Sequence, residues 1–363
     1  GQRFEQEAKV LRQLLASDAG LYVIDARDPV LGKHRDELAI LADCARPLLP
    51  VLNFVGDPAS RVPAWREALA RLGLHAVVEF DTVAPALDGE RRLFEKLATL
   101  LDAGADALNA LVAEHARQRD ARRQAAARMV AELLIDVAAL RVSSPPDEPA
   151  VNERAATLRD MVRHREHACA ADLLALYAFR STDLAAGELP EWQARQDMDL
   201  FHPQAIKDLG IQLGKGMAAG AAAGAAVDVF SAGLSLGTGM LVGAAVGGVW
   251  QSAERLGQRI MGRLRGWREL TVDDAILRVL ALRQQRLIRA LERRGHAAWQ
   301  PVVLQAPADE ALRRAPLPDE LREARSQPAW STLAAGYDDA PRRQAAVRQL
   351  AARLLQDEAE SPD

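Results

Sequence analysis

Residues 46–58 read RPLLPVLNFVGDP, an apolar run bounded on both sides by proline and other turn-forming residues. A continuous apolar run of this length is typical of a strand that is buried on both faces of a sheet. Two similar runs, GLYVIDARDP at 20–29 and HAVVEFDTVAP at 75–85, lie on either side of it in the sequence. We therefore expect three buried strands in the first part of the chain.

Three segments with helical periodicity precede or separate these runs, at residues 4–15, 34–44 and 65–74. Alternation of strands and helices at such short spacing builds a parallel sheet with helices packed against it. The sequence therefore predicts an α/β layer in residues 1–105.

The pattern changes after Asp88, where the strand signals stop and helical signals continue. The predicted helices cover about 89–140, 150–179, 270–298 and 321–357, and SSPPDEP at 143–149 is predicted to be a linker. We expect a mainly α protein with an N-terminal α/β part. Residues 106–363 are predicted to form an all-α domain whose C-terminal helices span 270–357.

The composition of the 363 residues narrows the classes of function. Hydrophobic residues make up 49% of the chain and aromatic residues only 4%, which favours closely packed helices over a β-sandwich or barrel. The net charge of −4 gives no overall basic field, so no nucleic-acid partner is expected. Cys44 and Cys169 form no CxxC pair, which favours a reducing, cytoplasmic location. The N-terminus shows neither a leader nor an initiator Met, so we expect part of a longer protein.

Polar residues stand where each predicted strand ends. Asp25 ends the first strand, Asn53 and Asp57 follow the second, and residues 80–85 follow the third. Ligands of open α/β sheets bind outside the carboxyl ends of the strands. We therefore expect any binding site of this layer at that edge.

The three strand ends, in this order and spacing, resemble the second half of a GTPase domain of the Era and TrmE type. LNFVG at 52–56 stands at the base-recognition motif of that family, and DTVA at 81–84 stands at the short motif after its last strand. The remainder of the chain resembles the proteobacterial domain of unknown function 3482, which follows such a GTPase domain in the same protein. Together the two resemblances cover essentially the whole sequence.

The resemblance implies a degenerate pocket for a nucleotide base. In the family motif Asn-Lys-x-Asp, the Asn braces the loop and the Asp accepts both ring N–H groups of guanine. Asn53 matches the motif, whereas Phe54 and Gly56 stand at the Lys and Asp positions. The residues assigned to the pocket by resemblance are Asn53, Asp57, Thr82 and Val83, the last two through a backbone N–H. The alternative is that these residues merely end strands.

The motifs with which this family holds phosphate are missing from the sequence. The loop GxxxxGK[ST], the magnesium-binding Thr of the first switch and the DxxG of the second would all precede residues 4–15. A Gly-Lys pair in GIQLGKGM at 210–217 has the wrong spacing and is not followed by Ser or Thr. We therefore expect no catalytic residue and no cofactor in this chain, with GTP and Mg²⁺ bound only by a longer parent protein.

By resemblance, the chain is the effector region of a GTP-binding protein and couples nucleotide state to a membrane or a protein partner. The alternative is a structural or interaction module with a vestigial nucleotide pocket. In the family, the strand that matches Leu21 to Asp25 pairs with the phosphate-loop strand. Its free edge is therefore also a candidate contact in a homodimer.

A glycine-rich stretch lies at 212–250. Its glycines form two GxxxGxxxG runs, namely Gly216, Gly220, Gly224, Gly239, Gly243 and Gly247. Glycine inside a helix costs about 1 kcal/mol relative to alanine, and this spacing lets two helix backbones approach closely. We therefore expect an antiparallel helical hairpin whose glycine faces are in contact.

Two interpretations of this hairpin stay open. Residues 229–253 carry no charge, and the basic residues beyond them include Arg255, Arg259 and Arg263. This pattern favours a hairpin that docks on an anionic membrane surface or inserts into it, which would make the protein peripheral to the inner membrane. The short arms and the Ala- and Gly-rich first arm favour instead a tightly packed hairpin inside a helical domain.

No metal site is expected. The sequence DMVRHREHAC groups Asp160, His164, His167 and Cys169 on one helical segment but matches no established zinc or di-iron spacing. The arginines between 117 and 128 alternate with acidic residues, as on a solvated helix face. No Ser-His-Asp or Cys-His arrangement stands out.

Overall fold

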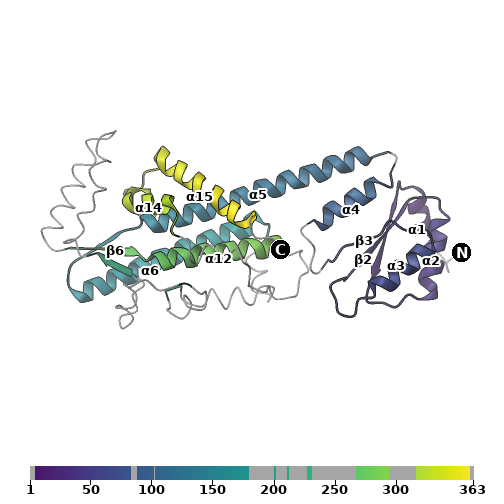
Figure 1. Cartoon of the computed structure of the whole chain (residues 1–363), viewed down its shortest axis with the longest axis horizontal. Coiled ribbons are helices and arrows are strands. Elements are labelled where there is room, and N and C mark those ends of the chain that lie inside the picture. Colours follow the sequence, from purple (N-terminus) through teal and green to yellow (C-terminus); the bar gives the residue numbers. More distant parts are fainter. Residues whose placement is uncertain are drawn as a thin grey trace. The chain divides into compact units, whose positions relative to one another are not determined.

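The computed structural model describes residues 5–82, 88–101, 103–179, 200–201, 211, 227–230, 267–293 and 316–359. The chain divides into two compact units, Gly1–Arg122 with Arg289–Val302 and Arg123–Ile288 with Val303–Asp363. Figure 1 shows their elements. The prediction of a mainly α protein with a small parallel sheet near its N-terminus is confirmed.

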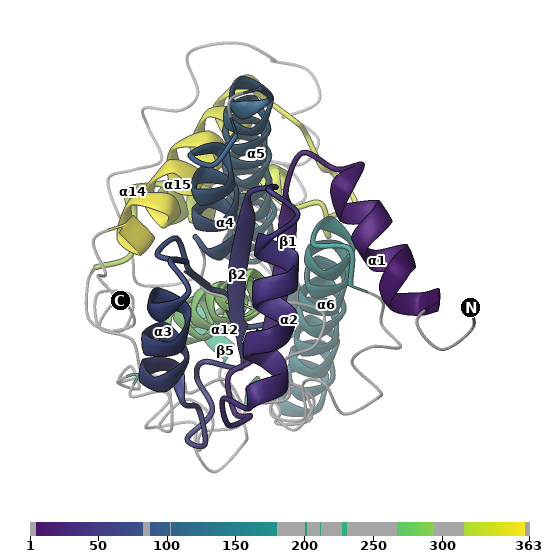
Figure 2. The same cartoon turned by 90° about the vertical axis from the view of Figure 1, so that its right-hand side faces the viewer.

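The first unit contains the parallel sheet, with helices between its strands (Figure 2). Its elements are α1 Glu5–Leu15, β1 Gly20–Asp25, α2 Gly32–Ala42, β2 Leu48–Asn53, α3 Val62–Arg71, β3 Val78–Glu79 and α4 Gly89–Ala98. The strand order is β1-β2-β3, and β2 runs parallel to both neighbours. All three predicted strands are confirmed. Asp25 pairs in register with Asn53, so the carboxyl ends of β1 and β2 meet at one edge.

Helices α2 and α3 supply the core on one side of the sheet. The core residues are Ile24, Ala26, Leu38, Leu48, Leu52, Trp65 and Leu69. Trp65 is 1% exposed, and its Nε1 donates a hydrogen bond to the carbonyl of Asp28 at 2.8 Å. Because the indole fills the core and its polar atom is satisfied, Trp65 fixes α3 against the loop that follows β1.

The outer edge of β1 has no strand beside it within the described residues. Leu21 and Val23 on this strand are 50% and 63% exposed, whereas their register partners Leu49 and Val51 on β2 are buried. An apolar strip about one strand wide is therefore uncovered along β1. Separately, the unpaired backbone edge of β1 in this described sheet is a ready template for a further strand.

The second unit is mainly helical, but it also contains a sheet. Its elements are β4 Val142–Ser144, α6 Glu148–Leu176, β5 Val227–Phe230, β6 Arg268–Val272, α12 Asp274–Arg293, α14 Asp319–Ser326, the short 3₁₀ helix η2 Pro328–Trp330 and α15 Pro341–Ala359. Two helices are divided between the units: α5, Ala105–Ala139, at Arg122, and α12 at Ile288. The strands form an antiparallel sheet of order β4-β6-β5. The prediction of an all-α domain was therefore wrong.

Two sequence signals near this sheet were misassigned. The helix predicted for 270–298 begins only at Asp274, because Asp273 caps it through a hydrogen bond from Ala275 N to Asp273 Oδ1 of 2.7 Å. The preceding Thr271 and Val272 are β-branched and belong to β6. The linker predicted for 143–149 is instead the end of β4 and the start of α6, whose cap Asp147 accepts a hydrogen bond from Ala150 N.

The six glycines of the two GxxxGxxxG runs lie outside the described residues, as do Val83, Arg255, Arg259 and Arg263. Within 212–250 the structure describes Val227–Phe230, which is strand β5 and not helix. Its sequence, VDVF, is rich in β-branched and aromatic residues, which favour a strand. β5 pairs with β6, so that Val227 lies opposite Val272 and Phe230 opposite Glu269. The expected connection between two helices therefore contains a strand.

The predicted helix at 321–357 is interrupted. It is replaced by α14, η2 and α15, with Pro328 opening η2 and Pro341 opening α15. Proline lacks the N–H that a continuing helix needs and is tolerated in the first turn. In the part of the chain that the structure describes, none of the helices combines the length and apolar character needed to cross a bilayer.

Candidate functional site

Asn53, the last residue of β2, organises the carboxyl edge of the sheet. Its side chain is nearly buried, with 9% exposed, and Oδ1 accepts three hydrogen bonds. The donors are Phe54 N at 2.8 Å, Thr82 N at 2.9 Å and Thr82 Oγ1 at 3.0 Å. Three donors on one atom identify it as the amide oxygen and fix the side chain. Asn53 therefore joins the end of β2 to the segment that follows β3.

Phe54 stands in the left-handed region of the backbone, with φ of 57°. Non-glycine residues adopt this conformation rarely, and it costs roughly 1–3 kcal/mol. The guanidinium carbon of Arg27 lies 4.0 Å from the centre of the Phe54 ring. The turn after β2 thus presents an aromatic ring with a cation on its face.

Arg27 is held beside that ring by two carboxylates. Its Nε donates to Asp25 Oδ1 at 2.9 Å and its Nη2 to Asp25 Oδ2 at 2.7 Å. Its Nη1 lies 3.8 Å from Asp57 Oδ2. The hydrogen bonds from the Arg27 side chain hold the pKa of Asp25 below its ordinary value. Asp25 is therefore an anion that serves to orient Arg27.

Asp57, a predicted base-pocket residue, has a local role in the loop. Its Oδ1 accepts a hydrogen bond from Ala59 N at 2.8 Å, and its backbone N–H donates to the carbonyl of Phe54 at 3.3 Å. These bonds close the turn after β2, as aspartates do in such turns. The same carboxylate faces Arg27.

Asp81 belongs to this site although the base motif gave no reason to single it out. It is 9% exposed, and its Oδ2 accepts a hydrogen bond from Gly56 N at 3.0 Å. A Cβ added at Gly56 would lie 3.4 Å from the same oxygen. The Asp81 carboxylate therefore lies directly beside position 56, where the resemblance expects a carboxylate that the glycine lacks.

The second unit contains a buried carboxylate that sequence patterns missed. Asp136 on α5 is fully buried and accepts hydrogen bonds from four donors on three other segments. The donors are Arg165 Nε at 2.8 Å, Arg343 Nη2 at 3.0 Å, Thr332 N at 3.1 Å and Thr332 Oγ1 at 2.8 Å. The two arginines are themselves largely buried. This arrangement ties α5 to α6 and α15.

Glu166 on α6 is a second buried carboxylate and is less well satisfied. It lies 3.0 Å from Arg283 Nε, but that nitrogen lacks hydrogen-bond geometry, so the pair is a charge contact only. Gln284 Nε2 donates to Glu166 Oε1 at 3.4 Å. Burial, only partly offset by Arg283, raises the pKa of Glu166 above its ordinary value.

The histidine-rich segment of α6 has structural contacts. Asp160 pairs with Arg163 at 2.7 Å, and His164 Nδ1 contacts the carbonyl of Asp160 at 2.9 Å. Cys169 is buried against the carbonyl of Met129, and burial raises its pKa to about 12. Among the described residues, no three His, Cys, Asp or Glu side chains are grouped so as to hold a metal ion.

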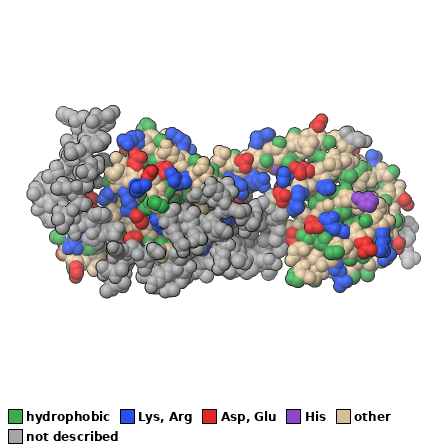
Figure 3. All heavy atoms as spheres, in the orientation of Figure 1, with side chains coloured by type: hydrophobic (Ala, Val, Ile, Leu, Met, Phe, Trp, Pro, Cys, Tyr) green, Lys and Arg blue, Asp and Glu red, His purple; other side chains and the backbone are tan. Residues whose placement is uncertain are grey.

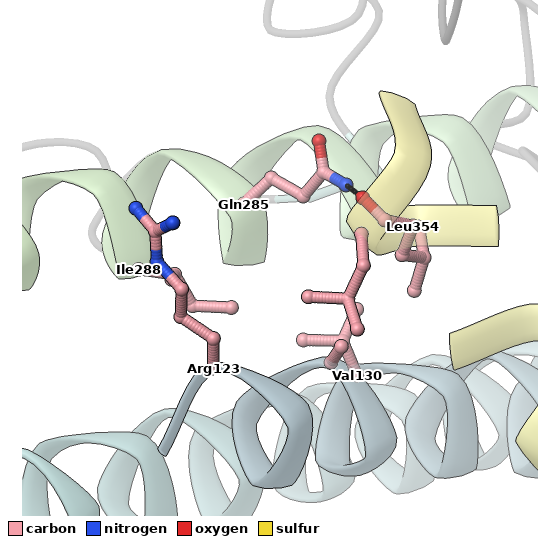
Figure 4. Close-up of a pocket in the computed structure, with 7 residues that line it drawn as sticks. Arg123, Val130, Gln285, Ile288 and Leu354 are labelled. Atoms are coloured by element: carbon pink, nitrogen blue, oxygen red, sulfur yellow. Dashed lines mark hydrogen bonds between the residues drawn. The ribbon is translucent and has the colours of Figure 1, made fainter. Parts of the chain in front are cut away.

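A small cleft lies between α5, α12 and α15 in the second unit (Figure 4). Its walls are Arg123, Ala127, Val130, Gln285, Ile288, Leu354 and Leu355. Gln285 Nε2 is directed at the carbonyl of Leu354, 3.4 Å away. On the face seen in Figure 3, acidic and basic side chains are interleaved over the described surface rather than gathered into one basic field.

Comparison with known families assigns the chain to one of them. The family model described as Domain of unknown function (DUF3482) matches residues 66–352, which is more than half of the chain. The chain belongs to this family. The search of curated proteins found no match. The search of solved structures found none either. The family match contains β3, Asp81 and Thr82 but begins after β2 and Asn53.

Proposed function

We propose that the chain is the effector part of a guanine-nucleotide-binding protein and transmits the state of the nucleotide to a membrane or a protein partner. The observation that carries this proposal is the triple hydrogen bond of Asn53. It couples the loop after β2 to the segment after β3, which are the two segments that the resemblance assigns to the nucleotide base. Thr82 is exposed beside it, so a ligand has access to this edge.

The topology of the sheet supports the same assignment. Its strands are parallel in the order β1-β2-β3, and the ends of β1 and β2 meet where open α/β sheets bind ligands. In this proposal the uncovered strip of Leu21 and Val23 is the contact for a further strand and helix of the nucleotide-binding layer. The phosphates and Mg²⁺ would be held by residues outside this chain, which has no GxxxxGK[ST] sequence.

Transmission to the helical unit would run through α4 and α5. Helix α4 follows the segment after β3, and its Phe94 packs edge-on against His115 of α5, with ring centres 6.1 Å apart. Glu90 Oε2 lies 3.7 Å from His115 Nδ1. Helix α5 continues beyond Arg122 into the second unit without a break. In this proposal a change at Thr82 passes along the chain to α4, from Phe94 to His115, and along α5 out of the first unit.

Hydrogen exchange of the chain with and without GDP tests this proposal. At a GDP concentration of ten times Kd, amides that open only in the free protein should exchange about tenfold more slowly. We expect this protection at residues 53–57, at 80–82 and in α4, and its loss in Asn53→Ala. Thr157→Ala, an exposed change on α6, is the control and should keep it. No protection by GDP at any of these residues would refute the proposal.

The second candidate is a structural or interaction module that associates with membranes through its glycine-rich segment. The pairing of β5 with β6 favours it. Phe230 and Glu269 lie opposite each other, so the two ends of the segment that connects them lie side by side at one end of this strand pair. Most of residues 229–253, the uncharged part of the sequence, fall in this connection, and Arg255, Arg259 and Arg263 follow. Basic residues next to an uncharged segment suit an anionic bilayer surface.

Vesicle flotation tests this second candidate. Replacing residues 231–266 with a Gly-Ser linker leaves β5 and β6 in the chain, so the sheet of the second unit is kept. We expect the intact chain to float with phosphatidylserine vesicles at low salt and to float less at high salt. The replacement variant should remain in the bottom fraction with the unbound protein. Equal behaviour of the two proteins would exclude membrane association through this segment.

A further inference from the structure

We infer that Glu166 of α6 and Gln284 of α12 form a hydrogen-bonded pair that depends on a proton. In this acid–amide pair, the neutral carboxyl group of Glu166 donates to Oε1 of Gln284 and accepts from its Nε2. Loss of the proton breaks the first of these bonds, so the junction between the two helices responds to pH. The inference concerns the second unit and is independent of the nucleotide proposal.

Both side chains of the pair are enclosed by protein. Glu166 is 2% exposed, and Gln284 has no exposed surface. Gln284 Nε2 donates to Glu166 Oε1 at 3.4 Å, but within the described part of the chain no group donates to Gln284 Oε1. A buried acceptor without a donor is costly, so a state that supplies the donor is favoured.

The protonation state of Glu166 decides whether that amide oxygen has a donor. An ionised carboxylate only accepts hydrogen bonds, whereas a neutral carboxyl group also donates one. Exchanging the two ends of the Gln284 amide does not help the ionised form, because the amide oxygen would then face a second acceptor. A neutral carboxyl group and a primary amide are complementary, since each has one donor and one acceptor for the other. The neutral form of Glu166 therefore satisfies Gln284, and the ionised form does not.

Arg283 on α12 opposes the neutral form of Glu166, but only in part. Its Nε lies 3.0 Å from Glu166 Oε1 and lacks hydrogen-bond geometry. Burial, together with the charge of Arg283, lowers the pKa of His167, so this neighbour on α6 adds no second cation at neutral pH. Burial raises the pKa of Glu166 in spite of Arg283. The other charged groups near this stretch of α6 act on Cys169 and are Arg165, Asp172 and Glu132.

The acid–amide pair should form as the pH falls and break as it rises. Because the pKa of Glu166 is raised in the folded protein, the pair is fully formed below pH 4.5 and is lost as the pH rises through the folded pKa. The ionised junction keeps the bond from Gln284 Nε2 and the charge contact with Arg283, but it leaves Gln284 Oε1 without a donor.

The pKa of Glu166 in a variant of Gln284 tests the inference, because two roles of Gln284 predict opposite signs. As the acceptor of the carboxyl proton, Gln284 raises this pKa, since it stabilises the neutral form. As a plain donor to the carboxylate, it lowers this pKa. Gln284→Met removes both amide groups and keeps a side chain of similar length. The inference therefore predicts a lower pKa of Glu166 in Gln284→Met.

The measurement is a ¹³C NMR titration of the side-chain carboxyl groups in the whole chain, in which the Glu166 signal is the one that Glu166→Gln lacks. We expect the pKa of Glu166 to lie above 4.5 in wild type and to fall toward 4.5 in Gln284→Met. Gln285→Met is the matched control. It changes the neighbouring side chain, which is directed at the carbonyl of Leu354, and should leave the pKa of Glu166 unchanged. Gln284→Asn draws the amide back by one methylene and should also lower this pKa, so the test does not depend on one variant.

Each outcome decides for or against the acid–amide pair. A lower pKa of Glu166 in the Gln284 variants, with Gln285→Met like wild type, supports it. An unchanged or higher pKa in the Gln284 variants overturns it, because Gln284 would then act as a donor to the carboxylate or have no part in the titration. An equal fall in Gln285→Met also overturns it, since that result would report a general loosening of α12. A wild-type pKa at or below 4.5 contradicts it directly.

Discussion

The polar cluster at the carboxyl edge of the first unit and the cluster around Asp136 in the second unit are built in opposite ways. Asn53 is neutral, and two of its three donors are backbone amides next to an exposed Thr82. Asp136 is charged, has no exposed surface and is bound by two arginines and by Thr332. The first cluster borders solvent, whereas the second is sealed and specifies the packing of helices.

Asp136→Ala should have the largest effect on stability. The change takes the carboxylate from the largely buried Arg165 and leaves Arg343 only the half-exposed Asp339 as an anion. Removal of one partner of a buried ion pair typically costs about 3–5 kcal/mol in the free energy of unfolding. Urea unfolding of the helical circular dichroism signal measures it. Asp160→Ala, which removes an exposed carboxylate on α6, is the control and should cost about 1 kcal/mol or less. A loss below about 1 kcal/mol for Asp136→Ala would erase the contrast between the two clusters.

Asn53→Ala should have a smaller effect, confined to the first unit. The change removes the neutral acceptor of the hydrogen bonds from Phe54 N and from Thr82, two positions close to solvent. This loss costs about 1–3 kcal/mol in the free energy of unfolding. The indole N–H signal of Trp65 in the ¹⁵N-labelled chain, followed during thermal unfolding, is a suitable measure, since this residue lies in the core of the first unit. Thr99→Ala at the end of α4 serves as the control. A loss as large as that of Asp136→Ala would mean that the edge cluster is structural too.

Glu166→Gln should change how stability depends on pH. Burial raises the pKa of Glu166 in the folded state above its ordinary value of 4.5. The folded protein therefore keeps this carboxyl group protonated at pH values at which the unfolded chain has lost the proton. Its stabilising contribution is fully present below pH 4.5 and is lost as the pH rises through the folded pKa. The melting temperature of Glu166→Gln should therefore rise relative to that of wild type as the pH rises from 4.5. A constant difference between the two proteins across this window would show that Glu166 has no raised pKa.

Arg27→Ala should have the smallest effect on stability. The Arg27 and Asp25 side chains are 41% and 31% exposed, and solvent screens the attraction in a pair of this kind. Calorimetry of unfolding should show a shift near the limit of measurement. A loss as large as that of Asn53→Ala would place Arg27 among the groups that hold the fold together, as the arginines around Asp136 do.

The parts of the fold that were predictable are those coded by local sequence. The buried run around Leu52 predicts β2, and the spacing of the strand ends points to Asn53 and Thr82, which the structure joins. The antiparallel sheet was missed because its strands are short and its partners distant, as in the contact of Arg141 with Glu269, 128 residues apart. Asp136 was missed for the same reason, since Arg343 follows it by 207 residues. Asp81 is identified only by its position next to Gly56 in the folded chain.

We propose that this chain holds the base side of a nucleotide site and not its phosphate side. Titration of guanosine and of GDP into the ¹⁵N-labelled chain, followed at the amides of Gly56 and Thr82, tests it most directly. We predict that both ligands shift these amides with similar millimolar affinity, about 4 kcal/mol, and that GTP is not hydrolysed. Micromolar binding of GDP, about 8 kcal/mol, would show that the chain also binds the phosphates, and unmoved amides would show that it holds no base; either result contradicts the claim.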